Sequence, residues 1–228
     1  MKSIALRSNH RVIEEIGPSN LIQRLGRYLF STHVNLVLNN YAVLDIKNKE
    51  NIPDYPFIIC GNHQSHLDGI ILSHVANKQF EYTAMIAAKD YWFDNKAKHL
   101  IASLFFNIIP IDRKSARNTY NIQKTTKLVR NFLDDRGKAV VILPEGTRSS
   151  SNKIRPFKKG IVILSKSSGL PIVPVYLEGS GKVWPKGKWF FRPGKIHATV
   201  GKPIFPEELD DDTGREYIRK QVEALQNG

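Results

Sequence analysis

Cysteine is almost absent from this sequence of 228 residues, in which Cys60 stands alone. One cysteine cannot close a disulfide within the chain, so the sequence excludes a disulfide-stapled secreted scaffold and makes a reducing location the default expectation. Cys60 lies in an apolar run, where a small buried hydrophobe is more frequent than a nucleophile. Repeats and low-complexity tracts are also lacking, and 41% hydrophobic residues suffice for one domain with a buried core.

Long apolar runs are missing as well. The longest one, residues 100–111, is interrupted by Asn107 and has about half of the roughly 20 residues that a membrane-spanning helix needs. Residues 1–9 have neither the apolar core nor the small-residue cleavage site of a signal peptide. We therefore expect no transmembrane span, and a peripheral or monotopic position on the cytoplasmic face if the protein meets a membrane.

Acidic residues are outnumbered, because 21 Asp and Glu stand against 34 Lys and Arg, which gives a net charge of +13. Such an excess favours an anionic partner, such as phospholipid headgroups, nucleic acid or a phosphate-bearing substrate, although a basic surface kept for solubility is an alternative. Zinc-finger spacing, a basic heptad helix and an aromatic RNA-binding signature are all absent. We therefore expect no nucleic-acid partner.

The first periodic segment, residues 19–38, predicts an amphipathic helix that Ser19 or Asn20 could cap. Its apolar stripe consists of Leu21, Ile22, Leu25, Tyr28 and Leu29. Arg24 and Arg27 fall off this stripe and predict a basic polar face. Such a helix suits a membrane interface, but packing against its own domain is equally compatible with the pattern.

From residue 57 onward, strand and helix patterns alternate. Short apolar runs predict strands at 57–60, 82–87, 108–111, 139–143, 172–177 and 196–200. Helical periodicity predicts helices at 69–76, 94–105, 116–136 and 160–168, and a last one from about residue 212. This alternation predicts an α/β fold, with a mixed, largely parallel sheet covered by helices and ligands at the carboxyl ends of the strands.

The loop after the first of these strands reads Asn-His-Gln-Ser-His-Leu-Asp. His63 and Asp68 are separated by a turn, so the carboxylate could orient the imidazole as a general base toward a substrate hydroxyl. A structural hydrogen bond is the commoner reason for a His near an Asp. His66 could join them as a third metal ligand, but no second cluster completes such a site, and we predict no metal.

Cationic side chains follow two further strands. Arg113, after Pro-Ile-Asp, and Arg148, within Pro-Glu-Gly-Thr-Arg-Ser, could each place a guanidinium on a phosphate or carboxylate. Arg113 could equally form a surface pair with Asp112. Lys158 and Lys159 precede a predicted helix whose N-terminus attracts anions. Each signal is weak alone, but together they indicate a phosphate-bearing substrate.

These blocks, in this order, resemble the glycerolipid acyltransferase superfamily, above all 1-acylglycerol-3-phosphate acyltransferases. The matching blocks are His63-x4-Asp68, Ile111-Asp112-Arg113, Glu145 to Ser149 and Leu170 to Val175, within about residues 55–205. The resemblance implies the glycerol-phosphate acyltransferase-like α/β fold, often preceded by a membrane-contacting helical segment. We accordingly assign residues 1–50 to an N-terminal amphipathic helical segment and residues 51–228 to the acyltransferase catalytic domain.

The resemblance also implies roles. His63 would be the catalytic base and Asp68 its orienting partner. The acceptor site would consist of Arg113, Glu145, Gly146, Thr147, Arg148 and Lys158. The acyl donor would be acyl-CoA or acyl-acyl-carrier protein, with no cofactor. The acceptor would be lysophosphatidic acid or a similar lipid, and relatives that acylate glycerol 3-phosphate or other lysophospholipids share the motifs.

A Gly-x-Ser-x-Gly nucleophile elbow is absent, so we expect direct acyl transfer without a covalent acyl-enzyme. Two alternatives stay open at this point. One is a non-catalytic membrane-binding protein on a degenerate acyltransferase scaffold. The other is a hydrolase that uses the same histidine to deliver the acyl group to water.

Overall fold

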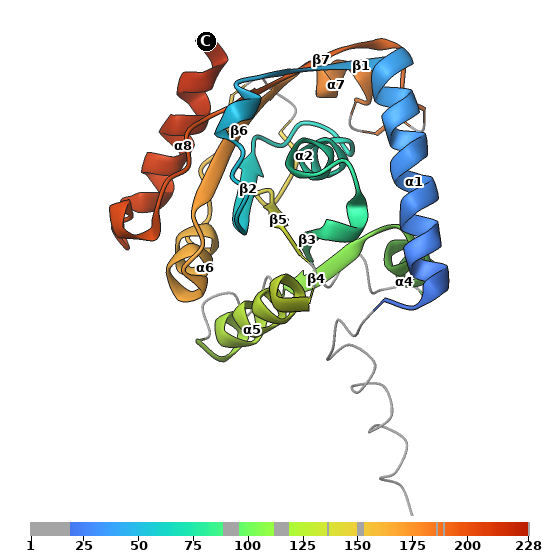
Figure 1. Ribbon diagram of the computed structural model, residues 1–228. Coiled ribbons are helices and arrows are strands. Elements are labelled where there is room, and N and C mark those ends of the chain that lie inside the picture. The colour runs from blue at the N-terminus through green and yellow to red at the C-terminus, as the bar shows by residue number, and fades with distance from the viewer. Residues whose placement is uncertain are drawn as a thin grey trace, which may run out of the picture.

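A computed structural model describes residues 19–88, 96–111, 119–135, 137–149, 153–185, 187–188 and 190–227 (Figure 1). Its centre is a seven-stranded sheet in the order β1-β7-β6-β2-β5-β3-β4. The strands are β1 (Ala42–Lys47), β2 (Phe57–Gly61), β3 (Thr83–Ala88), β4 (Asn107–Ile111), β5 (Ala139–Ile142), β6 (Ile172–Glu178) and β7 (Gly194–Val200). Strands β6 and β7 are antiparallel, and the other neighbours are parallel. The predicted mixed, largely parallel sheet is confirmed.

Helices cover both faces of this sheet. They are α1 (Leu21–Asn40), α2 (Asp68–Ala76), α4 (Lys96–Phe105), α5 (Thr119–Asp135), α6 (Gly160–Ser168), α7 (Ser180–Val183) and α8 (Gly214–Ala224), with short 3₁₀ turns η2 (Lys49–Asn51), η3 (Phe80–Tyr82), η4 (Pro206–Glu208) and η5 (Leu225–Asn227). Helices α1, α2 and α4 lie on one face, and α5, α6 and α8 lie on the other (Figure 1). Strand β2 is buried along its whole length because both of its faces are covered.

Strand β1 is the edge strand that the sequence analysis did not predict. It pairs in parallel with β7, and its residues alternate between the core and solvent, with Ala42 buried and Val43 exposed. An alternating strand that follows a helix directly has no apolar run to mark it. Although β1 belongs to the sheet, the proposed division of the chain at residue 50 stays a prediction.

Helix α1 begins where the sequence predicts, with a capping box. The Asn20 side chain accepts from the Gln23 backbone N–H over 2.9 Å, and the Gln23 side chain accepts from the Asn20 N–H over 3.1 Å. The predicted apolar stripe does not pack on the domain, because all of its members are exposed: Leu21, Ile22, Leu25, Tyr28 and Leu29.

The opposite side of α1 packs on the domain instead. Arg27 is buried and donates to the Glu81 carboxylate over 2.8 Å and to the Ser103 carbonyl over 3.0 Å. The prediction that Arg27 belongs to an exposed basic face is therefore wrong, because Arg27 is buried and forms an ion pair with Glu81 of η3. No helix within the described ranges has both the length and the apolarity needed to cross a bilayer.

Candidate active site

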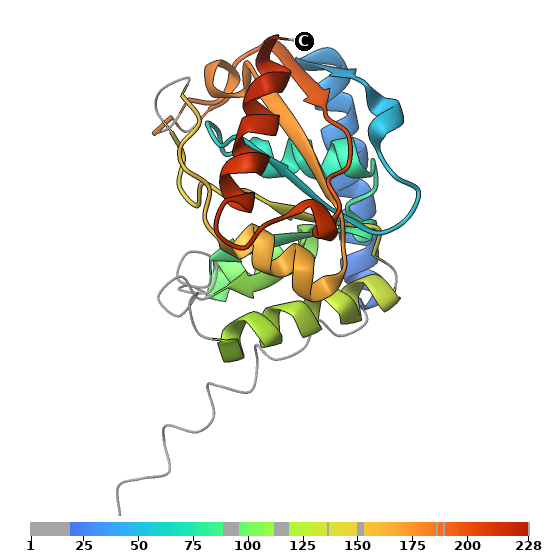
Figure 2. The same cartoon turned by 90° about the vertical axis from the view of Figure 1, so that its left-hand side faces the viewer.

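The predicted motifs meet at one edge of the sheet. Strands β2, β5 and β6 are neighbours, and their carboxyl ends point the same way because their pairings are parallel. The loops that follow them lie side by side at this edge (Figure 2), and hydrogen bonds join the loop after β2 to each of the other two. This is the edge at which ligands bind in parallel α/β sheets.

His63 and Asp68 form the predicted pair. His63 Nδ1 lies 2.9 Å from Asp68 Oδ2, and the same oxygen accepts the backbone N–H groups of Gln64 over 2.6 Å and Ser65 over 2.7 Å. Asp68 is the first residue of α2, so the N-terminus of this helix also favours its negative charge. Since Nδ1–H donates to the carboxylate, Nε2 keeps its lone pair and can accept a proton.

The backbone of His63 is held from both sides by the loop after β5. Its N–H donates to Glu145 Oε1 over 2.7 Å, and its carbonyl accepts from the Ser149 N–H over 2.7 Å. The second oxygen of Glu145 accepts from the Arg155 N–H over 3.1 Å. Burial raises the pKa of the Glu145 carboxyl, and its hydrogen bonds from His63 and Arg155 act in the opposite direction. Glu145 therefore joins three loop segments with both of its oxygens occupied.

Gly146 is required by the shape of the same loop. Its backbone has φ = +70°, and a Cβ atom there would lie 2.7 Å from Lys158 Nζ. The Lys158 side chain thus lies across the glycine, and its backbone N–H donates to the Pro144 carbonyl over 3.0 Å. Thr147 is exposed next to them. The positive φ accounts for the glycine, and the Lys158 side chain lying across it places a cation at this edge.

Arg148 lies in the loop after β5, directly before Ser149, whose N–H donates to the His63 carbonyl. Its Nη1 atom is buried and has no hydrogen-bond partner among the described residues. Its charge helps to lower the pKa of His66, after the larger effect of burial, which places it close to the 62–68 loop. A buried guanidinium nitrogen without a partner is suited to bind an anion. The predicted Arg113, with Asp112, lies outside the described residues.

Two positions that the sequence analysis did not single out hold the catalytic loop. The Asn62 side chain donates to the Leu177 carbonyl over 2.9 Å and accepts from the Leu177 N–H over 2.7 Å, as a neighbouring strand would. Ser65 Oγ donates to the Trp184 carbonyl over 2.9 Å. An Asn directly after a buried strand was the available signal, but its partner is 115 positions away in the chain.

The His66 ring contacts Trp184 and forms no hydrogen bond with the His63–Asp68 pair. It is exposed, and its ring centroid is 5.5 Å from that of Trp184. Desolvation lowers its pKa, as do the charges of Arg148 and His63. In the part of the chain that the structure describes, no three His, Cys, Asp or Glu side chains are arranged to hold a metal ion.

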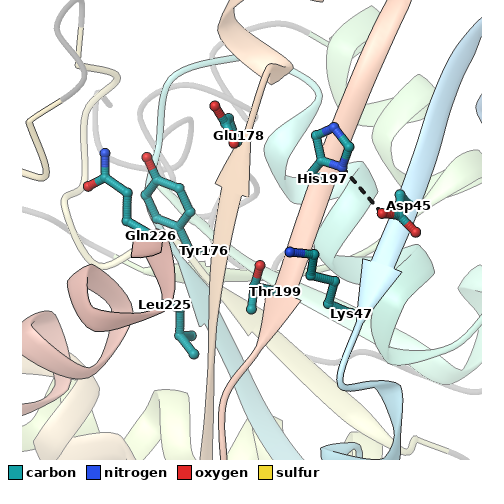
Figure 3. A pocket seen from close by; sticks show the side chains of 8 residues that line it. All are labelled: Asp45, Lys47, Tyr176, Glu178, His197, Thr199, Leu225 and Gln226. Atoms are coloured by element: carbon teal, nitrogen blue, oxygen red, sulfur yellow. Dashed lines mark hydrogen bonds and ion pairs between the residues drawn. The ribbon is translucent and has the colours of Figure 1, made fainter. Parts of the chain in front are cut away.

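A separate cavity of about 230 Å³ opens on the sheet beside α8 (Figure 3). It is lined by Asp45, Lys47, Tyr176, Glu178, His197, Thr199, Leu225 and Gln226. His197 Nδ1 lies 3.3 Å from Asp45 Oδ2, and both side chains are exposed. None of the predicted site residues lines this cavity, so the candidate active site is the loop edge and not this hollow.

Comparison with known proteins gives a consistent result. A sequence model of a family described as Acyltransferase matches residues 43–178. A chloroplastic 1-acyl-sn-glycerol-3-phosphate acyltransferase of Brassica napus is 30% identical over 176 residues, which are 73% of this chain and 46% of the relative. A 1-acyl-sn-glycerol-3-phosphate acyltransferase of Limnanthes douglasii is 31% identical over 200 residues, which are 86% of this chain and 67% of the relative.

A solved structure has the same fold. The crystal structure of the 1-acyl-sn-glycerophosphate (LPA) acyltransferase PlsC from Thermotoga maritima matches with a TM-score of 0.64 and 24% identity. The match covers 90% of this chain and 77% of that one. The chain spans about half the length of several of the curated relatives that it matches.

Proposed function

We propose, from the premise that this chain belongs to the Acyltransferase family, that it transfers a fatty acyl group from a thioester to the sn-2 hydroxyl of 1-acylglycerol 3-phosphate. The product would be phosphatidic acid. The observation that carries the proposal is the His63–Asp68 hydrogen bond of 2.9 Å beside the unpartnered guanidinium nitrogen of Arg148. The relatives of Brassica napus and Limnanthes douglasii are 1-acyl-sn-glycerol-3-phosphate acyltransferases, which supports the same acceptor.

The reaction follows from the free nitrogen of His63. As the acceptor hydroxyl oxygen attacks the thioester carbonyl carbon, Nε2 takes the hydroxyl proton. The C–S bond of the tetrahedral intermediate then breaks, and the imidazolium returns this proton to the departing thiolate. Asp68 stabilises the imidazolium and keeps the ring in the required orientation. General-base catalysis of this kind contributes roughly 10²–10⁴-fold to the rate.

The acceptor phosphate is assigned to the cations around the catalytic loop. Arg148 would form the charge-assisted hydrogen bonds, and Lys158, lying across Gly146, would add a second positive charge. Arg113 is proposed for the same phosphate on the resemblance alone. Glu145 would act as a positioning residue, because its oxygens hold His63 and Arg155.

We assign the exposed stripe of α1 to contact with a phospholipid surface. Its residues Leu21 and Ile22 are 81% and 72% exposed, which is costly in water and favourable at the headgroup boundary. This contact would place the active site at the cytoplasmic face of a membrane. A lipid acceptor resides in the same membrane. The donor would be acyl-CoA or acyl-acyl-carrier protein.

A product assay tests this function. Purified protein is given a palmitoyl thioester, on CoA or on acyl carrier protein, with lysophosphatidic acid, glycerol 3-phosphate or lysophosphatidylcholine in parallel. We expect thiol release that depends on lysophosphatidic acid, with phosphatidic acid identified by mass spectrometry. A lipid product from another acceptor would reassign the substrate within the family. Thiol release without any acceptor would indicate a hydrolase, and no release with any pair would contradict catalysis.

A further inference from the structure

The segment between Glu178 and Glu207 has a one-sided charge. It contains no acidic residue, and its cations are Lys182, Lys186, Lys188, Arg192, Lys195 and Lys202. Most of them fall within residues 182–195, here called the aromatic-basic loop. Its described cations, Lys182, Lys188, Arg192 and Lys195, are all exposed, and none forms an ion pair with another described residue. Unpaired cations concentrated in this way favour an anionic surface.

Aromatic side chains stand among these cations. Phe190 is 85% exposed, the largest exposed fraction among the described large hydrophobic residues. Its neighbour Phe191 turns inward, 5.8 Å from the Trp184 ring and 5.4 Å from the Tyr41 ring. Trp184 Nε1 donates to the Lys188 carbonyl over 2.7 Å, which closes the loop on itself. Phe190 is thus exposed to solvent while its neighbour Phe191 packs on Trp184 and Tyr41.

The aromatic-basic loop connects the catalytic loop with α1. On one side, the Trp184 carbonyl accepts from Ser65 Oγ, next to the catalytic histidine. On the other side, the Gly194 N–H donates to the Tyr41 carbonyl, at the end of α1, over 3.1 Å. Figure 1 shows the start of β7 beside this end of α1. Leu36 and Tyr41 at this end of α1 are themselves exposed, and the Tyr41 ring contacts Phe191 of the loop.

We propose that the aromatic-basic loop is a second membrane contact, which places Phe190 at the headgroup boundary and its cations on anionic phospholipid headgroups. Aromatic and basic residues are the side chains that anchor proteins at such boundaries. The inference rests on the proposed function only in its choice of a lipid surface. The loop would add a second contact to that of α1, and its hydrogen bond to Ser65 would keep this contact close to the catalytic loop.

Vesicle partition of the full-length protein tests the proposal. The probes are vesicles of phosphatidylcholine alone and of phosphatidylcholine with phosphatidylglycerol. We expect Phe190→Ser to lower partition about tenfold on both. The pair Lys188→Gln and Arg192→Gln should lower partition about 20-fold on the anionic vesicles and little on the neutral ones.

The matched controls remove similar groups elsewhere. Phe205→Ser removes a half-exposed phenyl ring at the start of η4. The pair Lys159→Gln and Lys166→Gln removes the same amount of charge at the start of α6 and within it, where the two lysines pair with Asp212 and Asp211. We expect both controls to partition as the wild type does. Equal losses in control and loop variants, or loop variants that bind like the wild type, would overturn the proposal.

A turnover assay separates this inference from the proposed function. With a short-chain, water-soluble donor and acceptor, the loop variants should keep wild-type turnover, since none of their side chains belongs to the proposed catalytic machinery. A raised KM for the soluble donor with unchanged vesicle binding would instead assign the cations to the donor and overturn the membrane contact. If the wild type has no transferase activity but the loop variants still lose vesicle binding, the function fails and the contact stands.

Discussion

The catalytic loop differs from the surface formed by α1 and the aromatic-basic loop in whether its polar and apolar groups have partners within the protein. In the catalytic loop, the N–H groups of His63, Gln64 and Ser65 all donate to buried carboxylates. On α1 and the aromatic-basic loop, apolar side chains such as Leu21 and Phe190 are exposed to solvent, and the described cations of the loop form no ion pair with another described residue. In the first region the backbone of the catalytic loop is held within the chain and the buried Arg148 Nη1 has no hydrogen-bond partner among the described residues, whereas in the second the apolar and cationic side chains are exposed.

This difference agrees with what each region is proposed to do. A general base must have its orientation set before the substrate arrives, so its supporting hydrogen bonds belong to the protein. A membrane contact gains its free energy only when the lipid covers the apolar surface and neutralises the cations. Substitutions in the first region should therefore change turnover, and substitutions in the second should change partition.

The largest expected effect is at the catalytic base. His63→Ala should lower turnover by at least about 10²–10⁴-fold, because the proposed acceptor of the hydroxyl proton is lost. Vesicle partition should not change. The matched control is His197→Ala, which removes a histidine that also contacts an aspartate, but in the cavity beside α8. A large loss of turnover in His197→Ala would show that the effect is not specific to the catalytic loop.

The next effect is at the proposed phosphate site. Arg148→Ala should lower kcat/KM for lysophosphatidic acid about 100-fold and leave the KM of the donor nearly unchanged, since a charge-assisted contact with the acceptor is lost. Arg130→Ala on α5, which removes an exposed arginine bonded to the Ser167 carbonyl, is the control. Equal losses for donor and acceptor in Arg148→Ala would argue against a phosphate role.

A smaller effect is expected at the positioning carboxylate. Glu145→Gln keeps an acceptor oxygen for one of its two N–H partners and places an amide NH₂ against the other. We expect kcat to fall about tenfold with little change in the acceptor KM, because the orientation of His63 is disturbed while the phosphate site is kept. A rise in KM without a change in kcat would show that Glu145 contacts the substrate instead.

The smallest expected effect is on the stability of the protein when the exposed stripe of α1 is changed. The pair Leu25→Ser and Leu29→Ser should change the free energy of unfolding by no more than about 0.5 kcal/mol, since both side chains are exposed in the fold. Denaturant unfolding measures this, and vesicle partition should fall in the same variant. A large loss of stability would mean that the stripe packs on the protein, and the contrast between the two regions would disappear.

Most elements of the fold were predictable because their signals are local. The apolar run that forms β2 and the helical spacing closed by Gly169 after α6 both appear in the structure within a residue of the prediction. Strand β1 was missed because an alternating edge strand has no comparable signal. The direction of β7 against β6 was likewise not predictable, since it depends on how the chain returns to the sheet.

The site was predictable only where its residues are close in sequence. His63 and Asp68 lie within one loop, so their contact follows from the spacing of the motif. The bonds from Glu145 to His63 and from Asn62 to Leu177 join segments 82 and 115 positions apart, and they exist only once the sheet has formed. The burial of Arg27 against Glu81 was missed for the same reason.

A double-mutant cycle on His63 and Asp68 tests the central claim most directly. Turnover is measured for His63→Ala, for Asp68→Asn, which keeps an oxygen for the Gln64 and Ser65 N–H groups, and for the double variant. Because Asp68 acts through the imidazole, we predict that the double variant is about as slow as His63→Ala alone. Losses that multiply, or wild-type turnover in His63→Ala, would contradict the account.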